Sequence, residues 1–213
     1  MSVPTVSVIT PTWQRHDLLL SRCVPSVQEQ EYPKVEHVVV SDGPDEYLSK
    51  MFASHVPAGH ARDIRQGRRH PVWYYEMGEH DPGARWGHWA RLRGIELAAG
   101  EYVTYLDDDD AYRPEHAAVL AAALDAHPDA GFAYSRMISH SGGGSCRIGA
   151  DPPVYGQIGT PMIMHRRELL DVATWEQSMP ANDWDLVSRW LAAGVGYVAA
   201  DADTVDVWPS ASR

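Results

Sequence analysis

The stretch Tyr102-Val103-Thr104-Tyr105-Leu106-Asp107-Asp108-Asp109-Asp110 decides the fold expected for this chain. Its first five residues are β-prone and mostly apolar, which predicts a buried strand, and four carboxylates follow that strand directly. Adjacent carboxylates repel one another unless a cation is present, and hard oxygen ligands suit Mg²⁺ or Mn²⁺. A divalent ion held there could bind a diphosphate and stabilise it as a leaving group. The alternative is a solvated acidic turn ahead of the helix that starts at Pro114, and the preceding strand favours the metal-binding interpretation.

Strand and helix patterns alternate around this stretch. Gly100 stands where a glycine C-cap would end the helix that precedes it. Such alternation predicts an α/β fold with a largely parallel central sheet, in which ligands bind beyond the carboxyl ends of the strands. The other predicted strands are 6–10, 38–41 and 72–75, and the predicted helices are 18–30, 86–99 and 114–126.

Polar clusters follow three of the predicted strands and are expected to meet at one edge of the sheet. They are Thr10-Pro11-Thr12-Trp13, Asp42-Gly43 and the four aspartates. Asp42 could accept a hydrogen bond from a nucleobase N–H, or it could be an Asx-turn residue before Gly43 and Pro44. Trp13 could stack on a base, or it could be a core or rim aromatic in a chain that has eight tryptophans.

The second half of the chain is less regular. The glycine- and serine-rich run from Ser139 to Ser145 predicts a mobile loop, which we expect to become ordered over a bound donor. A strand is expected near 161–164, with helices around 166–172 and 183–193. Asn182 or Asp183 could cap the last helix and offset its dipole. Alternatively, Asp183 could act as a general base that takes a proton from an acceptor hydroxyl.

Composition disfavours several classes of protein. The chain has 213 residues, of which 44% are hydrophobic and 22% charged, so we expect one soluble domain. A formal charge of −11 disfavours binding to nucleic acid or anionic lipid through a general basic field. We see no signal peptide, no apolar run long enough for a transmembrane helix and no disulfide framework, so a cytoplasmic location is expected. GxGxxG, Walker and GxSxG motifs are absent.

In order along the chain, these segments resemble the large family 2 of inverting glycosyltransferases, which have the GT-A fold. The resemblance covers the first 135 residues well and the remainder sparsely. The ordered set is specific, and it consists of Val6 to Arg15, Val38 to Gly43, Arg93 to Asp110, Pro114 and Asn182 to Trp184.

The resemblance implies a single GT-A domain over 1–213, with a Rossmann-like, mostly parallel sheet flanked by helices. Residues 1–135 would form the half that binds the nucleotide-sugar, and residues 136–213 would form the acceptor side. The donor would be a nucleoside-diphosphate sugar, with UDP favoured, and Mn²⁺ or Mg²⁺ would assist departure of the nucleoside diphosphate. An unidentified acceptor hydroxyl would attack the anomeric carbon in a single displacement that inverts its configuration.

The resemblance also implies roles for individual residues. Asp183 would be the catalytic base, and Asp109 together with Asp107 would bind the metal. Contacts to the nucleotide would come from Pro11, Trp13, Asp42, Asp108 and Arg85, with Arg91 as the alternative to Arg85 at the diphosphate.

The chain departs from the family's pattern at three places. Asn182 replaces the usual glutamate, Leu92 stands where the family often has asparagine, and no histidine follows Asp183 as a further metal ligand. These departures leave open a non-catalytic protein of the same fold that binds a nucleotide or a cation. A sugar nucleotidyltransferase is the other alternative, although the segment after the first strand lacks the glycine-rich loop that would hold a triphosphate.

Overall fold

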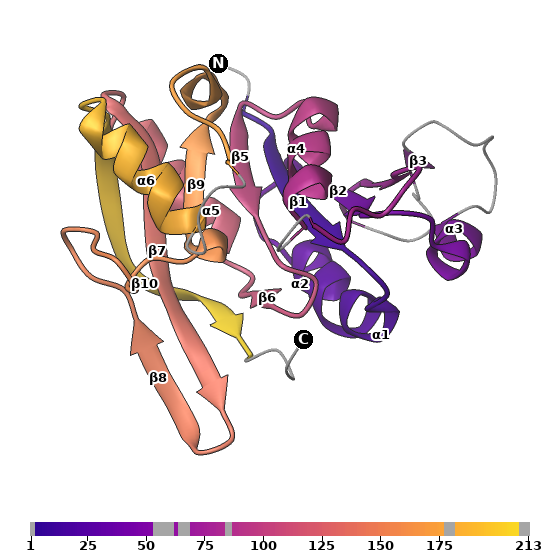
Figure 1. Ribbon diagram of the computed structural model, residues 1–213. Helices are drawn as coiled ribbons and strands as arrows, with labels where there is room; N and C mark the ends of the chain where they lie inside the picture. The colour runs from indigo at the N-terminus through magenta and orange to yellow at the C-terminus, as the bar shows by residue number, and fades with distance from the viewer. Residues whose placement is uncertain (1–2, 53–61, 64–68, 84–86, 177–181, 209–213) are drawn as a thin grey trace.

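A computed structural model describes residues 3–52, 62–63, 69–83, 87–176 and 182–208. These residues form one sheet with helices on both faces (Figure 1). The strands are β1 (Val6–Thr12), β2 (Val35–Ser41), β3 (Arg62–Asp63), β4 (Val72–Glu76), β5 (Tyr102–Tyr105), β6 (Ala111–Tyr112), β7 (Ala130–Ser141), β8 (Gly144–Ile148), β9 (Ile163–Arg166) and β10 (Gly196–Val207). The helices are α1 (His16–Leu18), the π-helix η1 (Leu19–Cys23), α2 (Val24–Gln28), α3 (Glu46–Phe52), α4 (His88–Leu97), α5 (His116–Ala126), the 3₁₀ helices η3 (Thr160–Met162) and η4 (Arg167–Asp171), and α6 (Asn182–Ala192).

The sheet is parallel in its first half and mixed in its second. Its strand order is β3-β4-β2-β1-β5-β9-β7-β10-β6, with β8 paired to β7. Strands β4, β2, β1 and β5 are parallel neighbours, as are β7 and β10. Strand β9 runs antiparallel between β5 and β7 and joins the two parallel parts. The predicted α/β class with a largely parallel sheet is confirmed.

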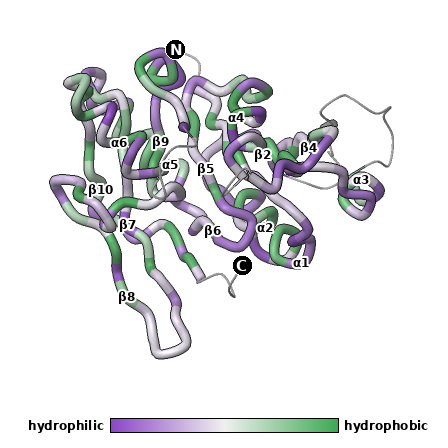
Figure 2. The backbone as a smooth tube through the Cα atoms, viewed as in Figure 1, coloured by the Kyte–Doolittle hydropathy of each residue, from purple (hydrophilic) through white to green (hydrophobic). Residues whose placement is uncertain are grey.

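The sheet separates two hydrophobic cores. Successive side chains of a strand point to opposite faces, so Val8 of β1 enters one core and Ile9 enters the other. Leu19 of η1 and Leu120 of α5 complete the first core, whereas Trp190 of α6 packs in the second together with α4. Figure 2 shows apolar residues concentrated along the central strands. Among the described residues, no helix is long and apolar enough to span a membrane.

The first predicted helix, 18–30, contains a change of helical type. Helical residues run without a break from His16 to Gln28, and the middle turn, Leu19–Cys23, is a π-helix. Pro25 lies two residues beyond the π-helix and has no N–H to continue the α-helical ladder, which gives a local reason for the wider turn. The helix therefore exists at the predicted place.

The prediction that Gly100 caps the helix before it is wrong. Helix α4 ends at Leu97, its C-cap residue Ala98 is extended, and Gly100 has no left-handed φ. A Cβ atom at Gly100 would lie 2.6 Å from the Thr5 carbonyl oxygen and 2.5 Å from Ser7 Oγ. Glycine is thus required here for close approach of the chain to β1, and its N–H donates to Ser7 Oγ at 2.8 Å.

Gly100→Ala is expected to lower the free energy of unfolding by ~1–3 kcal/mol, because the new methyl group meets backbone that cannot move without disturbing β1. Gly78→Ala is the matched control, since a Cβ atom there meets nothing within 4 Å. Urea unfolding of both variants measures the difference. Equal stabilities would show that the β1 edge yields without cost.

The prediction of a loop from Ser139 to Ser145 is also wrong. These residues belong to a β-hairpin in which β7 and β8 pair antiparallel, with His140 opposite Ser145 and Ser141 opposite Gly144. The glycines serve the tight turn, where Gly144 has a φ of +140°. The hairpin projects from the body of the molecule (Figure 1).

Two short elements before α6 also differ from expectation. The strand expected at 161–164 is β9 at Ile163–Arg166, preceded by a 3₁₀ turn, and the helix expected at 166–172 is the 3₁₀ helix Arg167–Asp171. The expected strands of the first half and the helices α4, α5 and α6 are confirmed, with boundaries shifted by a few residues.

His116 makes folding stability depend on pH. It is buried, its Nδ1 lies 2.7 Å from Thr204 Oγ1, and burial lowers its pKa to about 3. The unfolded chain binds a proton at His116 below pH ~6.5, so the free energy of unfolding is expected to be ~2 kcal/mol lower at pH 5 than at pH 7.5 through this group. The buried Asp110, whose pKa burial raises, acts in the opposite direction.

Because the two effects oppose each other, the prediction concerns a difference between variants. His116→Asn keeps a hydrogen-bonding group near Thr204 but cannot be protonated. In urea unfolding, its free energy of unfolding is expected to fall by ~2 kcal/mol less than that of the wild type when the pH is lowered from 7.5 to 5. His127→Gln, at an exposed histidine, should keep the wild-type pH dependence. An unchanged pH dependence in His116→Asn would contradict the assignment.

Candidate active site

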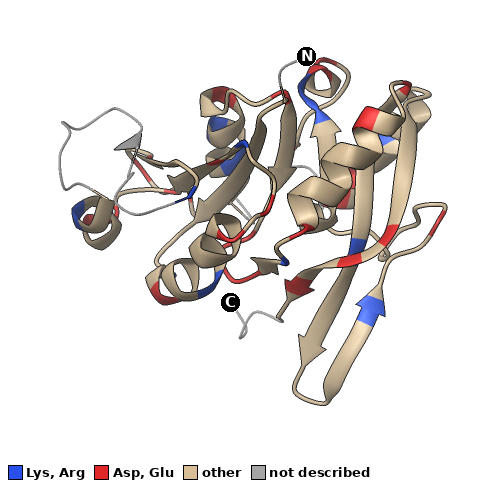
Figure 3. Cartoon of the chain, turned by 180° about the vertical axis from the view of Figure 1, so that it is seen from behind, with Lys and Arg blue, Asp and Glu red and all other residues tan. Residues whose placement is uncertain are grey.

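The acidic turn Asp107–Asp110 leaves β5 at its carboxyl end, and its four carboxylates have different surroundings. The Asp110 N–H donates to the Asp107 carbonyl oxygen at 3.2 Å, which closes the turn. The side chain of Asp107 is 37% exposed, whereas those of Asp108, Asp109 and Asp110 are buried. Figure 3 shows acidic residues in this part of the ribbon, between the N-terminal helices and β6. The turn therefore divides its charge between one accessible and three enclosed groups.

Arg15 lies against two of the enclosed aspartates. Its Nη1 is 2.9 Å from Asp108 Oδ1, and its Nη2 donates to Asp109 Oδ2. Thr12 Oγ1 donates to Asp108 Oδ2 at 2.8 Å. Burial raises the pKa of Asp108 to about 6, and Arg15 and Thr12 limit that rise. Arg15 thus neutralises part of the turn.

Asp110 is tied to the end of β10. The Trp208 N–H donates to Asp110 Oδ1 at 3.1 Å. Burial, with the charges of Asp107 and Asp109, raises the pKa of Asp110 to about 8, so the group is largely neutral near pH 7. Arg22 stacks over the Trp208 ring at 3.9 Å and donates to the Asp109 carbonyl oxygen. Asp110 therefore serves to hold the end of β10 against the acidic turn.

Asp183 lies in the first turn of α6, and burial and the charge of Asp107 raise its pKa. Its Oδ1 accepts the Trp184 N–H at 2.7 Å. Burial raises the pKa of Asp183, backbone hydrogen bonds at Trp184 and Thr160 oppose the rise, and the charge of Asp107 adds to it. The charge of Asp107 therefore acts on the Asp183 carboxyl group across the space between β5 and α6. A partly buried carboxylate with a raised pKa can take a proton from a hydroxyl group. The bond to Trp184 also suits a role at the start of the helix.

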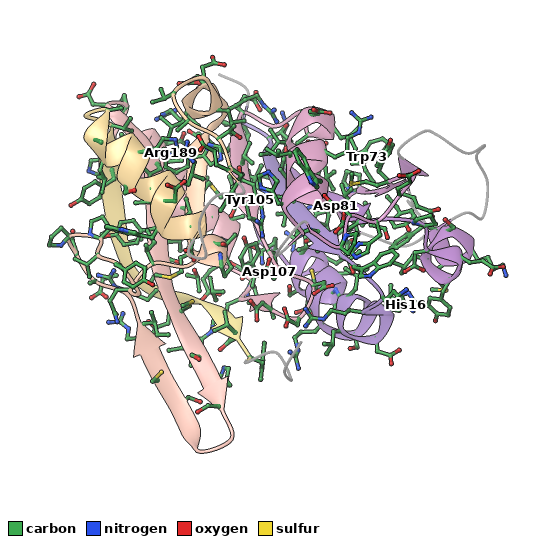
Figure 4. The ribbon with its side chains drawn as sticks, in the orientation of Figure 1. His16, Trp73, Asp81, Tyr105, Asp107 and Arg189 are labelled. Carbon is green, nitrogen blue, oxygen red and sulfur yellow. The ribbon has the colours of Figure 1, made fainter. Side chains whose placement is uncertain are left out.

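Arg91 faces the acidic turn from α4. It is buried, its Nη2 is 3.3 Å from Asp107 Oδ1, and its guanidinium stacks on Trp175 at 4.6 Å from the ring centroid. Figure 4 shows Asp107 near the middle of the molecule, below Tyr105. Arg85, predicted at the same place, lies outside the described residues.

A second cluster lies at the carboxyl ends of β1 and β2. Asp42 is buried, and its Oδ1 has no hydrogen-bond partner among the described residues. His80 Nδ1 is 2.8 Å from the Asp42 carbonyl oxygen and 3.3 Å from Oδ2. Trp13 stacks on His80 with ring centroids 4.3 Å apart and planes within 5°. Burial raises the pKa of Asp42, although His80 opposes the rise. An unpaired buried acceptor beside an aromatic ring can recognise a ring N–H donor.

Thr12 connects the two clusters. Its carbonyl oxygen accepts the Asp42 N–H at 2.8 Å, and its hydroxyl donates to Asp108. Pro11, one residue earlier, packs against Gly87 at the start of α4, where a Cβ atom would lie 2.6 Å from Pro11 Cβ. The prediction that polar residues after β1, β2 and β5 meet at one edge is confirmed.

Sequence reasoning missed His80, Arg15 and Arg22. His80 follows β4, a parallel strand whose carboxyl end lies at the same edge, so strand order could have indicated it. The arginines are the counter-charges that four adjacent aspartates require, but the sequence does not tell which of its basic residues supply them.

The acidic turn supplies few ligands for a metal. Within the described residues, no three His, Cys, Asp or Glu side chains are arranged to hold an ion. Asp107 and Asp109 offer hard oxygen donors, and Mg²⁺ is commonly held by one or two carboxylates with the phosphates of a bound nucleotide. The residues therefore fit a cation that is bound jointly with a diphosphate.

Comparison with known proteins gives concordant matches. The model of the family described as "Glycosyl transferase family 2" matches residues 7–172. A putative colanic acid biosynthesis glycosyl transferase, WcaA of Escherichia coli (strain K12), is 30% identical over 119 residues, which are 56% of this chain and 37% of that protein. The GalNAc(5)-diNAcBac-PP-undecaprenol beta-1,3-glucosyltransferase of Campylobacter jejuni is 29% identical over 108 residues, which are 51% and 30% of the two chains. The chain spans 13 to 37% of the length of the curated relatives that it matches.

Solved structures share the fold. TarS 1-349 of S. aureus in complex with UDP-GlcNAc has a TM-score of 0.73 at 19% identity, covering 98% of this chain and 60% of that one. The mannosyltransferase PcManGT of Pyrobaculum calidifontis, in complex with GDP-Man and Mn²⁺, has a TM-score of 0.70 at 18% identity, covering 100% and 59%. The likeness confirms the predicted GT-A fold.

Proposed function

We propose that this chain, which belongs to glycosyl transferase family 2, moves a sugar from a UDP-sugar to an acceptor hydroxyl by a metal-assisted single displacement that inverts the anomeric configuration. The observation that carries the proposal is the continuous edge from Asp42 through Thr12 to the acidic turn. Burial raises the pKa of Asp183, and its carboxyl group is close enough to the turn for the charge of Asp107 to raise that pKa further. In this proposal residues 1–135 bind the donor and residues 136–213 form the acceptor side.

The nucleotide end of this edge is formed by Asp42 and Trp13. The unpaired Asp42 Oδ1 would accept the N3–H of uracil. Trp13, one face of which stacks on His80, would stack on the base with its other face. A uracil ring presents one N–H donor between two carbonyl groups, which suits a single buried acceptor. Asp108 and Pro11 would line the path toward the ribose.

The diphosphate would lie over the acidic turn. Asp109 and Asp107 would hold Mn²⁺ or Mg²⁺ together with the phosphates, and the ion would neutralise charge on the departing UDP. The Mn²⁺ in the complex of PcManGT supports this choice of cofactor. Arg91 and Arg85 are the cationic candidates at the diphosphate, and Arg91 is held against Asp107 at 3.3 Å.

Asp183 would take the proton of the acceptor hydroxyl as that oxygen attacks the anomeric carbon. Its pKa is raised by burial, so it holds a proton more readily than an exposed aspartate would. Attack opposite to the leaving UDP inverts the configuration. A product with retained configuration would contradict this assignment.

A non-catalytic nucleotide-binding protein is the second candidate, and Asn182 favours it because the residue replaces the family's usual glutamate before the base. Release of UDP from a UDP-sugar separates the two candidates. The binding protein would hold the donor and release no UDP with any acceptor.

The nucleotide assignment is tested by calorimetric titration with UDP in the presence of MnCl₂. Asp42→Ala is expected to weaken UDP binding by about 10- to 150-fold, which corresponds to the ~1.5–3 kcal/mol of a hydrogen bond to a charged group. Asp17→Ala, at an exposed aspartate of α1, serves as the control and should bind UDP normally.

Titrations with GDP, CDP and ADP test the choice of base, since only a base with a suitably placed ring N–H should depend on Asp42. Equal affinity of wild type and Asp42→Ala for UDP would remove Asp42 from the site. Absence of binding by every nucleotide would sink the proposed function.

A further inference from the structure

An exposed tyrosine, Tyr155, lies against Trp184, a partly buried residue in the first turn of α6 that packs on the second core. Tyr155 is 70% exposed, the largest value among the large apolar side chains of the described residues. Its ring meets Trp184 edge to face, with centroids 6.5 Å apart and an angle of 80° between the planes. The neighbouring Val154 is exposed as well. Single exposed apolar side chains are common on protein surfaces, so what distinguishes Tyr155 is its contact with Trp184, the residue that follows Asp183.

The backbone presents Tyr155 on a tight turn. The Gln157 N–H donates to the Val154 carbonyl oxygen at 3.0 Å, and Gly156 has a φ of +75°. This geometry is that of a type II turn with Tyr155 at its second position. Gln157 Oε1 also accepts the Gly149 N–H at 3.2 Å, which connects the two ends of the loop. A ring held in this way loses little conformational freedom when a ligand covers it.

Tyr155 and Trp184 lie near Asp183 and not near Asp42 and Trp13, where the nucleotide is proposed to bind. Trp184 follows Asp183 and donates its N–H to it, and the loop that carries Tyr155 continues to Thr160, whose backbone also bonds Asp183. The loop after β8 passes the lower end of α6 (Figure 1). The cluster at Asp42, by contrast, is built from β1, β2 and the segment after β4.

Charge around the pair disfavours a phosphorylated ligand. Asp183 and Asp185 lie in the same helical turn, and Asp151 lies in the same loop as Tyr155. The arginine of this helix, Arg189, is already paired with Asp185 at 2.8 Å and with Glu176 at 3.2 Å. A neutral ligand meets no repulsion from these carboxylates, whereas a phosphate group would.

We propose that Tyr155 and Trp184 bind a sugar ring of the acceptor, so that the acceptor substrate is an uncharged saccharide. One face of a pyranose consists of C–H groups that pack against an aromatic ring, while its hydroxyls stay hydrated at the rim. A sugar ring stacked on Tyr155 would lie beside the turn of α6 that carries Asp183. This inference rests on the proposed function for the role of Asp183, but the binding site itself does not depend on it.

The test is saturation-transfer NMR on the full chain with the methyl β-glycosides of glucose, galactose and N-acetylglucosamine. Ring C–H signals are expected with at least one of them. Tyr155→Ala should weaken that glycoside about tenfold, equal to about 1.4 kcal/mol. Tyr155→Phe keeps the aromatic face and should bind normally. Tyr47→Ala, at another exposed tyrosine, on α3, should also bind normally.

Two outcomes would overturn the inference. One is the absence of any signal that depends on Tyr155 with every glycoside of the panel. The other is binding of sn-glycerol 3-phosphate at Tyr155 without binding of a glycoside. Failure of the proposed function is seen separately, as loss of UDP binding in the calorimetric titration. A glycoside signal that depends on Tyr155 would then still establish the saccharide site.

Discussion

Asp183→Asn is expected to reduce transfer of the sugar by ~10²–10⁴-fold, the usual contribution of a positioned general base, while UDP affinity stays at the wild-type value. Asparagine has nearly the same shape and its amide oxygen can still accept the Trp184 N–H, which Asp183 accepts at 2.7 Å. What it cannot do is accept the acceptor proton. The measurements are the rate of UDP release with saturating donor and the calorimetric affinity for UDP.

Asp185→Asn is the matched control, because Asp185 lies two residues further along α6 and pairs with Arg189. Its transfer rate should stay near that of the wild type. Full activity in Asp183→Asn would remove the base from the mechanism and leave Asp183 as a helix-start residue. In that case the melting temperature would fall, through loss of a negative charge near the helix N-terminus.

Asp109→Asn is expected to abolish the dependence of UDP binding on Mn²⁺ and to lower the transfer rate by ~10²–10³-fold, because a bound cation contributes several kcal/mol to stabilising the leaving group. The variant keeps the size of the side chain and can still contact Arg15. Mn²⁺ titration followed by electron paramagnetic resonance, with and without UDP, measures the binding directly.

Asp110→Asn controls for the disturbance of an acidic turn. Burial raises the pKa of Asp110 to about 8, so asparagine resembles the neutral form already present near pH 7. Its Mn²⁺ binding should match that of the wild type. If both variants lose Mn²⁺ equally, the turn acts through its structure and Asp109 is not a specific ligand.

The first half of the fold could be predicted because its information is local. Strand Val35–Ser41 contains the apolar run Val38-Val39-Val40, and the turn residues that follow such strands mark the edge where ligands bind. The same local signals indicated Asp42, Trp13 and the acidic turn. Gly100 was misassigned because its packing against Thr5 and Ser7 depends on residues more than ninety positions away.

The second half could not be predicted in the same way. Strands β7 and β10 are each twelve residues long, and neither is a β-branched run: both contain glycine and alanine, and β10 also contains three aspartates. Their stability comes from pairing with each other across more than sixty residues, which no local pattern reveals. The glycines near Ser141 suggested flexibility, whereas in the structure they form the turn of a hairpin.

The place of β10 in the sheet has a consequence for the order in which the molecule folds. Val205 of β10 pairs with Tyr112 of β6, and the Trp208 N–H reaches Asp110 across 98 positions of sequence. During synthesis, residues 107–110 leave the ribosome well before β10. The contacts of β10 and Trp208 with β6 and Asp110 form only after β10 has been synthesised. Non-local pairings of this kind have a high contact order and form slowly. The enclosure of Asp110 by the end of β10 therefore depends on the last strand of the sheet, whereas Thr12 and Arg15 contact the turn from the first.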